Sequence, residues 1–171
     1  AGATVLDEPV RGYGSACLAG ITYCQKKIPQ PDIAVFLDGD LSDFPYQMRE
    51  LVQPIIEGKT DMVIGSRTPG ERARGSITVQ QIFGNWLATY LLRLFFKAKF
   101  TDLGPFRAIR FQTLLALDMQ DRSYGWTVEM QVKAAKQKIR FMEIPVGYRK
   151  RIGVSKISGT VKGRIIGGYK I

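Results

Sequence analysis

Two aspartates separated by one residue directly follow an apolar segment, in the sequence Phe36-Leu-Asp38-Gly-Asp40. The apolar run over residues 33–37 is typical of a strand buried on both faces, and ligands of α/β proteins bind at the carboxyl ends of such strands. Gly39 permits close approach of the two carboxylates. Because carboxylates this close repel one another unless a cation or a diphosphate–metal complex lies between them, Asp38 and Asp40 are predicted to bind a divalent metal.

Five further segments carry polar or glycine residues in patterns suited to binding. A glycine-rich turn, Arg11-Gly12-Tyr-Gly14-Ser, precedes an expected helix, where backbone N–H groups and the charge of Arg11 are suited to a phosphate. The other four are Ile64-Gly-Ser-Arg67, Thr101-Asp102-Leu-Gly-Pro-Phe-Arg107, Gly125-Trp-Thr-Val-Glu129 and Tyr148-Arg-Lys-Arg151-Ile-Gly-Val-Ser155-Lys156.

Each segment also has a purely structural interpretation. Asp43, two residues before Pro45, has the character of a helix N-cap. Glu129 suits the first turn of a helix, Trp126 suits a core, and Arg107 suits a surface strand. The basic run 148–156 alone would suit a solvated loop.

The residue types present exclude several chemistries. The chain contains no histidine, so any metal must be held by oxygen ligands, which favours Mg²⁺ or Mn²⁺, and any general base must be a carboxylate. Cys17 and Cys24 are the two cysteines. Their spacing matches no zinc motif, and we interpret them as reduced core residues of one helix.

The formal net charge of +10 is distributed unevenly along the 171 residues. Residues 1–66 contain 5 basic and 9 acidic residues, which leaves 20 of the 25 basic and 6 of the 15 acidic residues for the remainder. This asymmetry favours a polyanionic partner, which leaves nucleic acid, anionic lipid and a phosphorylated substrate as alternatives.

The apolar patterning predicts an α/β fold in a single domain. Strands are expected over residues 33–38, 61–65, 106–110 and 140–148, and helices over 14–27, 45–57, 77–97, 110–119 and 127–138. The strand–helix–strand unit at 33–65 predicts a doubly wound parallel sheet. The loop from Thr68 to Ser76, rich in glycine and charge, is expected to be mobile.

Taken in order, these segments resemble family 2 glycosyltransferases, in particular the dolichyl-phosphate mannose synthase and polyprenyl-phosphate glucosyltransferase group. The matching pieces are RGYGSA at 11–16, FLDGDLSDFP at 36–45, DMVIGSR at 61–67, TDLGPFRAIR at 101–110, GWTVEMQ at 125–131 and EIPVGYRKRIGVSKISGT at 143–160. Six segments in the right order over most of the chain make the resemblance specific.

The resemblance implies a GT-A fold, which is Rossmann-like with a mostly parallel central sheet flanked by helices. It implies a nucleoside-diphosphate sugar donor, a divalent metal on Asp38 and Asp40, and transfer with inversion. Relatives begin with a strand and a Pro-Asn-Glu loop that bind the nucleoside. We therefore expect residues 1–171 to form one catalytic domain that lacks this N-terminal strand.

Roles for the remaining site residues follow from the same resemblance. Donor contacts are expected from Arg11, Gly12, Gly14 and Arg67. A lipid-phosphate acceptor, already ionised, would be held by Arg107, Arg149, Arg151, Ser155 and Lys156. A hydroxyl acceptor would instead need Asp102 or Glu129 as the base. Asp40 is expected to bind the metal directly, with Asp38 supporting it or contacting the donor ribose.

A membrane-surface acceptor, most simply a polyprenyl phosphate, is the favoured interpretation. The helix expected at 77–97 carries more apolar and aromatic residues than one buried stripe requires, and Lys97 and Lys99 lie at its end. We therefore expect a location at the cytoplasmic face of a membrane, peripheral or through segments outside this chain. The alternative for the helix is burial on two sides.

Four other functions stay open from the sequence alone. The first is a family 2 enzyme that acts on a saccharide hydroxyl in cell-wall or surface polysaccharide synthesis. The others are a nucleotidyltransferase, a non-catalytic fragment that anchors a complex, and a basic nucleic-acid-binding domain. No nucleic-acid-binding module is recognisable in the sequence, so no nucleic-acid partner is expected.

Overall fold

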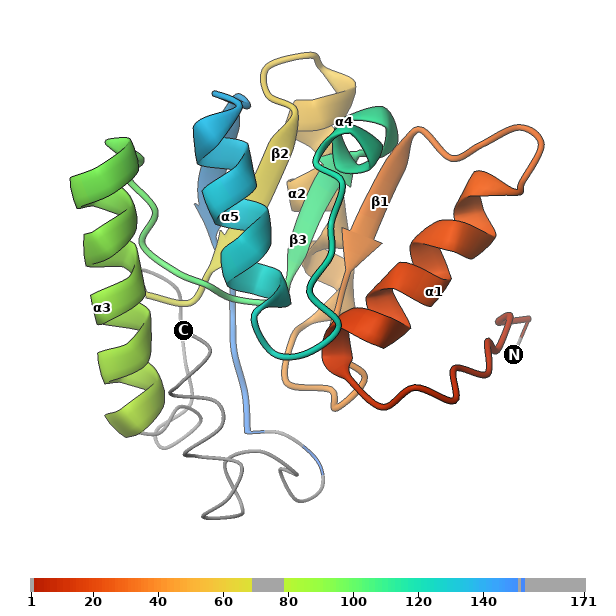
Figure 1. Cartoon of the computed structure of the whole chain (residues 1–171), viewed down its shortest axis with the longest axis horizontal. Helices are drawn as coiled ribbons and strands as arrows, with labels where there is room; N and C mark the ends of the chain where they lie inside the picture. Colours follow the sequence, from red (N-terminus) through yellow and green to blue (C-terminus); the bar gives the residue numbers. More distant parts are fainter. Residues whose placement is uncertain (1, 69–78, 151, 153–171) are drawn as a thin grey trace.

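The computed structural model describes residues 2–68, 79–150 and 152, and Figure 1 shows their arrangement. The elements in chain order are α1 (Tyr13–Gln25), β1 (Ile33–Phe36), the 3₁₀ helix η1 (Pro45–Gln47), α2 (Met48–Ile56), β2 (Met62–Ser66), α3 (Val79–Phe96), β3 (Arg107–Arg110), α4 (Phe111–Ala116), α5 (Trp126–Lys136) and β4 (Phe141–Pro145). Each helix and strand predicted from the apolar pattern is therefore present.

The described strands form a mixed sheet in the order β1-β3-β2-β4. Strand β3 pairs antiparallel with both β1 and β2, whereas β2 and β4 pair in parallel with Met62 opposite Phe141. The prediction of a central sheet flanked by helices is confirmed. The fully parallel, doubly wound sheet is corrected, because β3 enters between β1 and β2 in the opposite direction.

Each face of the sheet is covered by a different set of helices. Alternate residues of one strand point to opposite faces, so Val63 packs with Leu51 and Ile55 of α2, while Ile64 packs with Trp126 and Met130 of α5. Helix α1 also contributes to the second layer, through Cys17, Leu18, Ile21 and Cys24. Both thiols are unpaired, as predicted.

Helix α3 lies at the outer edge of the molecule beside α5 (Figure 1), and its side chains divide into a buried and an exposed set. Ala88 and Leu92 face the interior. Large apolar and aromatic residues are exposed on the opposite side, namely Ile82, Phe83, Trp86, Tyr90 and Leu94, and at the end of the helix, where Phe95 lies. We call these six residues the α3 outer face. The alternative that α3 is buried on two sides is therefore wrong for the described part of the chain.

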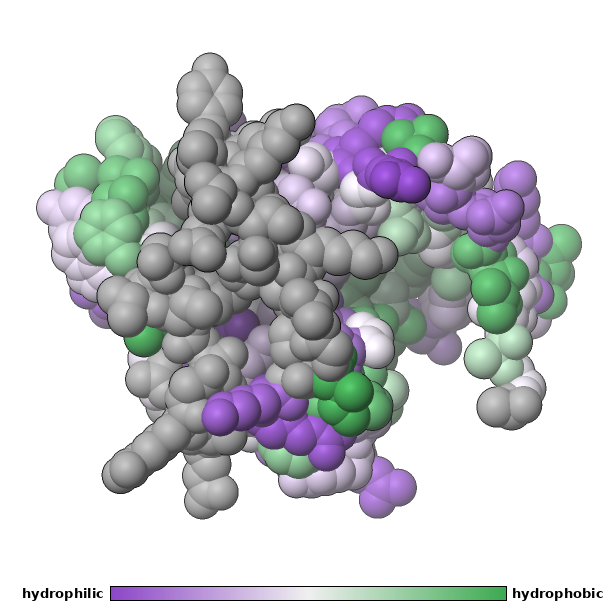
Figure 2. Space-filling view, turned by 90° about the horizontal axis from the view of Figure 1, so that it is seen from below, coloured by the Kyte–Doolittle hydropathy of each residue, from purple (hydrophilic) through white to green (hydrophobic). Residues whose placement is uncertain are grey.

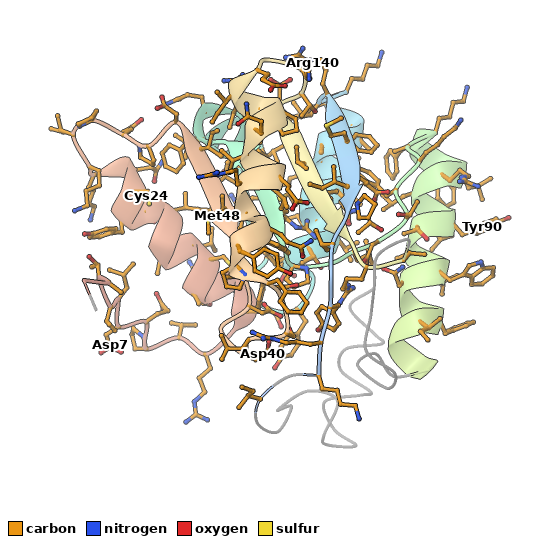
Figure 3. All side chains as sticks on the ribbon, turned by 180° about the vertical axis from the view of Figure 1, so that it is seen from behind. Asp7, Cys24, Asp40, Met48, Tyr90 and Arg140 are labelled. Carbon is orange, nitrogen blue, oxygen red and sulfur yellow. The ribbon has the colours of Figure 1, made fainter. Side chains whose placement is uncertain are left out.

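Aromatic side chains of the α3 outer face contact one another along the helix. The ring centroids of Phe83 and Trp86 lie 5.9 Å apart, and those of Trp86 and Tyr90 lie 5.8 Å apart in a stacked arrangement. Tyr90 points outward, away from the sheet (Figure 3). Among the described residues, no helix combines the length and apolarity that crossing a bilayer demands.

Candidate active site

The predicted metal-binding aspartates lie in the turn after β1, at the end of the sheet opposite Arg140 (Figure 3). The Oδ1 atom of Asp40 accepts hydrogen bonds from the backbone N–H of Ser42 at 2.9 Å and from its hydroxyl at 2.5 Å. These bonds hold the turn and fix one oxygen of the Asp40 carboxylate. The basic segment after β4 lies alongside, because the backbone N–H of Arg149 donates to the Ser42 carbonyl at 2.9 Å.

The ligand chemistry of this turn fits a hard divalent cation. Asp38 and Asp40 offer carboxylate oxygens, which Mg²⁺ and Mn²⁺ prefer, and the described residues contain no group of three or more His, Cys, Asp or Glu arranged to hold a metal. Further ligands would have to come from a bound diphosphate or from water. The metal at Asp38 and Asp40 stays a prediction.

A third carboxylate, Asp43, belongs to this region and was misinterpreted from the sequence. Asp43 is not a helix cap: η1 has Phe44 at its N-cap position and no side-chain cap bond. Its side chain is 1% exposed, and neither carboxylate oxygen has a hydrogen-bond partner within the described structure. Burial, and then the nearby charge of Asp38, raise the pKa of Asp43 to about 6. An unsatisfied buried carboxylate increases the negative potential that would attract a cation.

Arg149 is the predicted acceptor-phosphate residue that the structure places beside the aspartate turn. Its Nε donates to the carbonyl of Leu41, and its guanidinium lies 4.8 Å from the ring centroid of Phe44. The other predicted phosphate ligands Arg151, Ser155 and Lys156 fall outside the described residues, as do residues 69–76 of the loop expected to be mobile.

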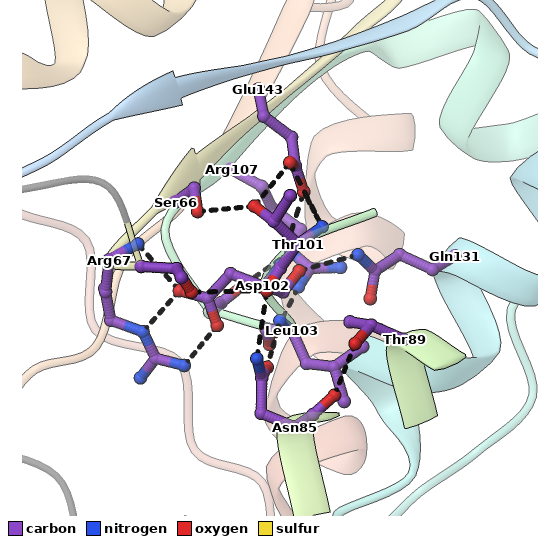
Figure 4. Close-up of polar contacts among 12 residues, drawn as sticks. Ser66, Arg67, Asn85, Thr89, Thr101, Asp102, Leu103, Arg107, Gln131 and Glu143 are labelled. Atoms are coloured by element: carbon purple, nitrogen blue, oxygen red, sulfur yellow. Dashed lines mark hydrogen bonds and ion pairs between the residues drawn. The ribbon is translucent and has the colours of Figure 1, made fainter. Parts of the chain in front are cut away.

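Arg67 and Asp102 form a bidentate ion pair (Figure 4). The Arg67 Nε and Nη2 atoms donate to the two Asp102 oxygens at 2.8 and 2.7 Å, and the backbone N–H of Arg67 adds a third bond at 2.7 Å. Asp102 is only 2% exposed. This pairing disfavours Asp102 as a base, because taking up a proton would weaken the pair, and its catalytic role stays a prediction. The guanidinium of Arg67 is directed to Asp102, and its donor contact also stays a prediction.

The ion pair is one part of a larger set of bonds that holds residues 101–104, which we call the clamped loop (Figure 4). Glu143 of β4 accepts from the Thr101 backbone N–H at 2.8 Å and from its hydroxyl at 2.6 Å. Gln131 of α5 donates to the Asp102 carbonyl at 2.8 Å. Asn85 of α3 bonds both Thr101 and Leu103. Side chains from separate elements thus fix the backbone of this loop.

Arg107 supports the clamped loop from beneath. It is fully buried, and its guanidinium donates to the carbonyls of Leu103 and Thr127 at 3.2 Å and also to the carbonyl of Gly104. Burial lowers the pKa of Arg107 to about 10. The predicted role in binding an acceptor phosphate is corrected, since the side chain is inaccessible and its donors are engaged by backbone carbonyls.

The glycine-rich turn before α1 packs against another loop of the protein. The backbone N–H groups of Gly14 and Ser15 donate to the carbonyls of Ser123 and Arg122, each at 3.0 Å. A Cβ atom on Gly12 would lie 1.9 Å from the Arg122 carbonyl oxygen, and one on Gly14 would lie 1.9 Å from that of Asp121. These glycines therefore permit close backbone packing, which corrects the predicted phosphate contacts of Gly14. Arg11 is exposed beside the turn, and its donor role stays a prediction.

Glu129 holds the loop that packs on this turn. Its two oxygens accept from the backbone N–H groups of Gln120 and Asp121, each at 2.8 Å, and Lys133 pairs with it at 2.8 Å. Burial tends to raise the pKa of Glu129, but these hydrogen bonds outweigh burial, so the pKa is lowered. A carboxylate bound in this way is a weaker base and holds the loop in place, and the catalytic role of Glu129 stays a prediction.

We expect Glu129→Gln to lower the free energy of unfolding by about 1–2 kcal/mol, because an amide N–H would face a backbone N–H. The lowered pKa means that the wild-type carboxylate stabilises the fold above its unfolded pKa near 4.5, and that this stabilisation is lost as the pH falls through the lower folded pKa. Denaturant titrations should therefore show a larger difference in the free energy of unfolding between the two proteins at pH 7 than at pH 3. Glu50→Gln, at an exposed carboxylate of α2, is the control and should change little. Unaltered stability at pH 7 would contradict this role.

Comparison with known proteins places the chain in a family. The sequence profile of Glycosyl transferase family 2 matches residues 2–117, well over half of the chain. The chain belongs to glycosyl transferase family 2. The resemblance inferred from the six sequence segments is thereby confirmed. This assignment favours a sugar-transferring enzyme over the nucleotidyltransferase and nucleic-acid-binding alternatives.

Two curated relatives extend the similarity over most of the chain. An uncharacterised glycosyltransferase of Mycobacterium tuberculosis is 34% identical over 166 residues, covering 96% of this chain and 72% of the relative. An undecaprenyl-phosphate mannosyltransferase of Micrococcus luteus is 30% identical over 161 residues, covering 91% of this chain and 64% of the relative.

Solved structures support the fold. The glucosyl-3-phosphoglycerate synthase of Mycobacterium tuberculosis, solved in complex with phosphoglyceric acid, superposes with a TM-score of 0.60 at 18% identity, over 86% of this family 2 chain. The chain spans about half the length of that structure, at 49%. The predicted GT-A fold is therefore confirmed at the level of architecture.

Proposed function

We propose that this family 2 chain is the catalytic part of an inverting glycosyltransferase that moves a sugar from a nucleoside-diphosphate sugar to a polyprenyl phosphate at a membrane surface. The relative named undecaprenyl-phosphate mannosyltransferase, at 30% identity, supports this acceptor class. The engagement of the carboxylates of Asp102 and Glu129 supports it independently.

The observation that carries the proposal is the engagement of both candidate bases. A hydroxyl acceptor must lose a proton as it attacks, so it needs a carboxylate that can take the proton. Asp102 is saturated by Arg67, and Glu129 is saturated by two backbone N–H groups and Lys133. A phosphate monoester is already ionised at neutral pH and needs no base. The arrangement therefore favours a phosphate acceptor over a saccharide hydroxyl.

The transfer itself is a single displacement. An oxygen of the acceptor phosphate forms a bond to the anomeric carbon from the side opposite the diphosphate. The bond between that carbon and the diphosphate oxygen breaks, and the nucleoside diphosphate leaves with the electron pair. Asp38 and Asp40 would hold Mg²⁺ or Mn²⁺, which when bound supplies charge that stabilises the leaving diphosphate. Arg149, beside the aspartate turn, is placed to attract phosphate oxygens.

The α3 outer face supports a lipid surface as the place where the acceptor is met. Exposed aromatic residues with one polar edge suit the boundary between headgroups and acyl chains. In Figure 2, apolar and weakly polar atoms gather along the edge of the molecule that α3 forms. Arg93, Lys97 and Lys99 are exposed near the end of the same helix and complement anionic headgroups.

The proposed function is tested by measuring transfer from radiolabelled sugar donors. GDP-mannose, UDP-glucose and UDP-N-acetylglucosamine would each be offered with Mn²⁺ to undecaprenyl phosphate in vesicles and, separately, to soluble oligosaccharides. We expect one donor to label the lipid phosphate and none to label the oligosaccharides. Labelling confined to the oligosaccharides would overturn the acceptor class while leaving the family assignment intact.

Membrane attachment through α3 predicts that Trp86→Ser weakens binding to vesicles that contain phosphatidylglycerol. Trp86 is 57% exposed, and losing its burial among lipid chains should lower the partition coefficient by roughly tenfold or more. Co-sedimentation at low salt measures this change. Tyr46→Ser is the control, because Tyr46 is an exposed aromatic residue of η1 rather than of α3. Equal loss in the two variants would argue against α3 as the attachment site.

A further inference from the structure

In the part of the chain that the structure describes, helix α3 makes contacts with other elements on one side only: its outer face is exposed, and its inner edge contacts the clamped loop. Trp86 belongs to the outer face, and the preceding residue, Asn85, faces the loop (Figure 4). In a helix, adjacent residues point about 100° apart, so one turn can present both sides at once. Any shift of this turn must move both side chains together.

Asn85 bonds the clamped loop through both ends of its amide. Its Nδ2 donates to the Thr101 carbonyl at 3.0 Å, and its Oδ1 accepts from the Leu103 backbone N–H at 2.8 Å. A single side chain therefore hydrogen-bonds the backbone on both sides of Asp102. Thr89, one turn further along α3, instead bonds the carbonyls of Asn85 and Trp86 within the helix. Of the α3 side chains that the structure describes, Asn85 is the one that hydrogen-bonds this loop.

The other side chains that bond the clamped loop come mostly from the sheet, from the residues that follow β2 and from α5. Arg67 follows β2, Glu143 lies on β4, and Gln131 lies on α5, so these three contacts are fixed by the sheet and its covering helix. Helix α3 differs because it packs at the outer edge and contacts mainly α5. A movement of α3 can therefore change the hydrogen bonds of the clamped loop without disturbing the sheet.

We propose that Asn85 is a positioning residue that couples contact of α3 with an anionic lipid surface to the order of the clamped loop. This inference rests on the proposed membrane-surface function. When lipid holds α3 in place, the two hydrogen bonds of the Asn85 side-chain amide keep residues 101–103 in the position in which Asp102 pairs with Arg67. In the absence of lipid, small movements of α3 lengthen those bonds and loosen the loop. The clamped loop and its Arg67–Asp102 pair are then ordered where the lipid surface is present.

Hydrogen exchange at the amides of residues 101–104 tests this coupling directly. Wild-type protein would be measured with and without vesicles of phosphatidylcholine and phosphatidylglycerol, beside Asn85→Ala and Asn85→Asp. Asn85→Asp retains an acceptor for Leu103 but loses the donor to Thr101. Thr89→Val is the matched control on the same helix. Co-sedimentation establishes that each variant binds the vesicles, and circular dichroism establishes that each is folded.

We expect vesicles to slow exchange of the Leu103 amide in wild type and in Thr89→Val by about three- to tenfold, which is the protection that one hydrogen bond provides. Asn85→Ala should bind the vesicles as well as wild type does, but the vesicles should not slow exchange of its Leu103 amide. In Asn85→Asp the vesicles should slow this exchange less than in wild type. A role that is only structural would raise exchange in the variants yet preserve the response to vesicles. Equal responses in wild type and Asn85→Ala would overturn the coupling.

Hydrogen exchange, taken together with the sugar-transfer assay described above, distinguishes failure of this inference from failure of the proposed function. If lipid slows exchange in wild type but no sugar reaches undecaprenyl phosphate, the acceptor proposal fails and the coupling stands. If sugar is transferred and exchange does not respond to lipid, the coupling fails and the proposed function stands. If wild-type protein does not bind the vesicles, both fail together.

Discussion

Replacing Asp40 with asparagine should lower metal-dependent sugar transfer by at least about a thousandfold, because an amide oxygen is a weak substitute for a carboxylate on a divalent cation. The fold should be retained. Asparagine still offers an Oδ1 atom to the backbone N–H and hydroxyl of Ser42, which are the bonds that Asp40 makes within the turn. Transfer rates with Mn²⁺, together with thermal unfolding, measure the two expectations.

Two controls accompany the Asp40 variant. Asp32→Asn changes an exposed carboxylate just before β1 and should leave transfer unchanged. Excess chelator should bring the wild-type rate down to that of the Asp40 variant. Full activity of Asp40→Asn, or of wild type in excess chelator, would show that the aspartate turn binds no catalytic metal.

Breaking the Arg67–Asp102 pair should destabilise the protein by about 3–5 kcal/mol, because removing one partner leaves a charge that is nearly buried and unpaired. We expect this loss from Arg67→Met and from Asp102→Leu alike. Since the double variant removes both charges, it should recover most of the stability. A cycle of the two single variants and the double variant, measured by denaturant unfolding, gives the coupling energy directly.

The same set of variants also distinguishes a structural role of Asp102 in the clamped loop from a role as the general base. If Asp102 clamps the loop, Arg67→Met should impair sugar transfer as severely as Asp102→Leu, because either change releases the same backbone. If Asp102 were instead the base, its loss alone would abolish transfer at normal stability. Additive stability losses in the double variant would contradict a coupled pair.

The elements of the fold could be predicted from the sequence, but the direction of one strand could not. Continuous apolar runs and helical spacing located each helix and strand, because the buried positions of one element are apolar residues at a regular, short spacing in the sequence. Strand β3 has only four residues, with Arg107 and Arg110 at its ends, and such a segment carries no signal of direction or of neighbours. Its antiparallel position between β1 and β2 depends on the path of the chain after α3.

The candidate site was predictable where function depends on local spacing and unpredictable where it depends on distant partners. Asp38 and Asp40 lie at the end of a strand, as their spacing indicated. The pairing of Asp102 could not be predicted because its partner, Arg67, is 35 residues away in sequence. Single polar residues such as Asn85 and Glu143 belong to no distinguishing pattern, so sequence reasoning alone does not select them.

The clamped loop has a consequence for the order in which the molecule folds. Apart from Arg107, the side chains that bond its residues lie 16 to 42 positions away, on α3, on α5, on β4 and, for Arg67, just after β2. Contacts of this span close large loops of chain, so they form after local helices and usually after the folding barrier. Weakening them should therefore speed unfolding more than it slows folding. During synthesis, Glu143 emerges last of these partners, so a nascent chain has no ordered site until β4 has left the ribosome.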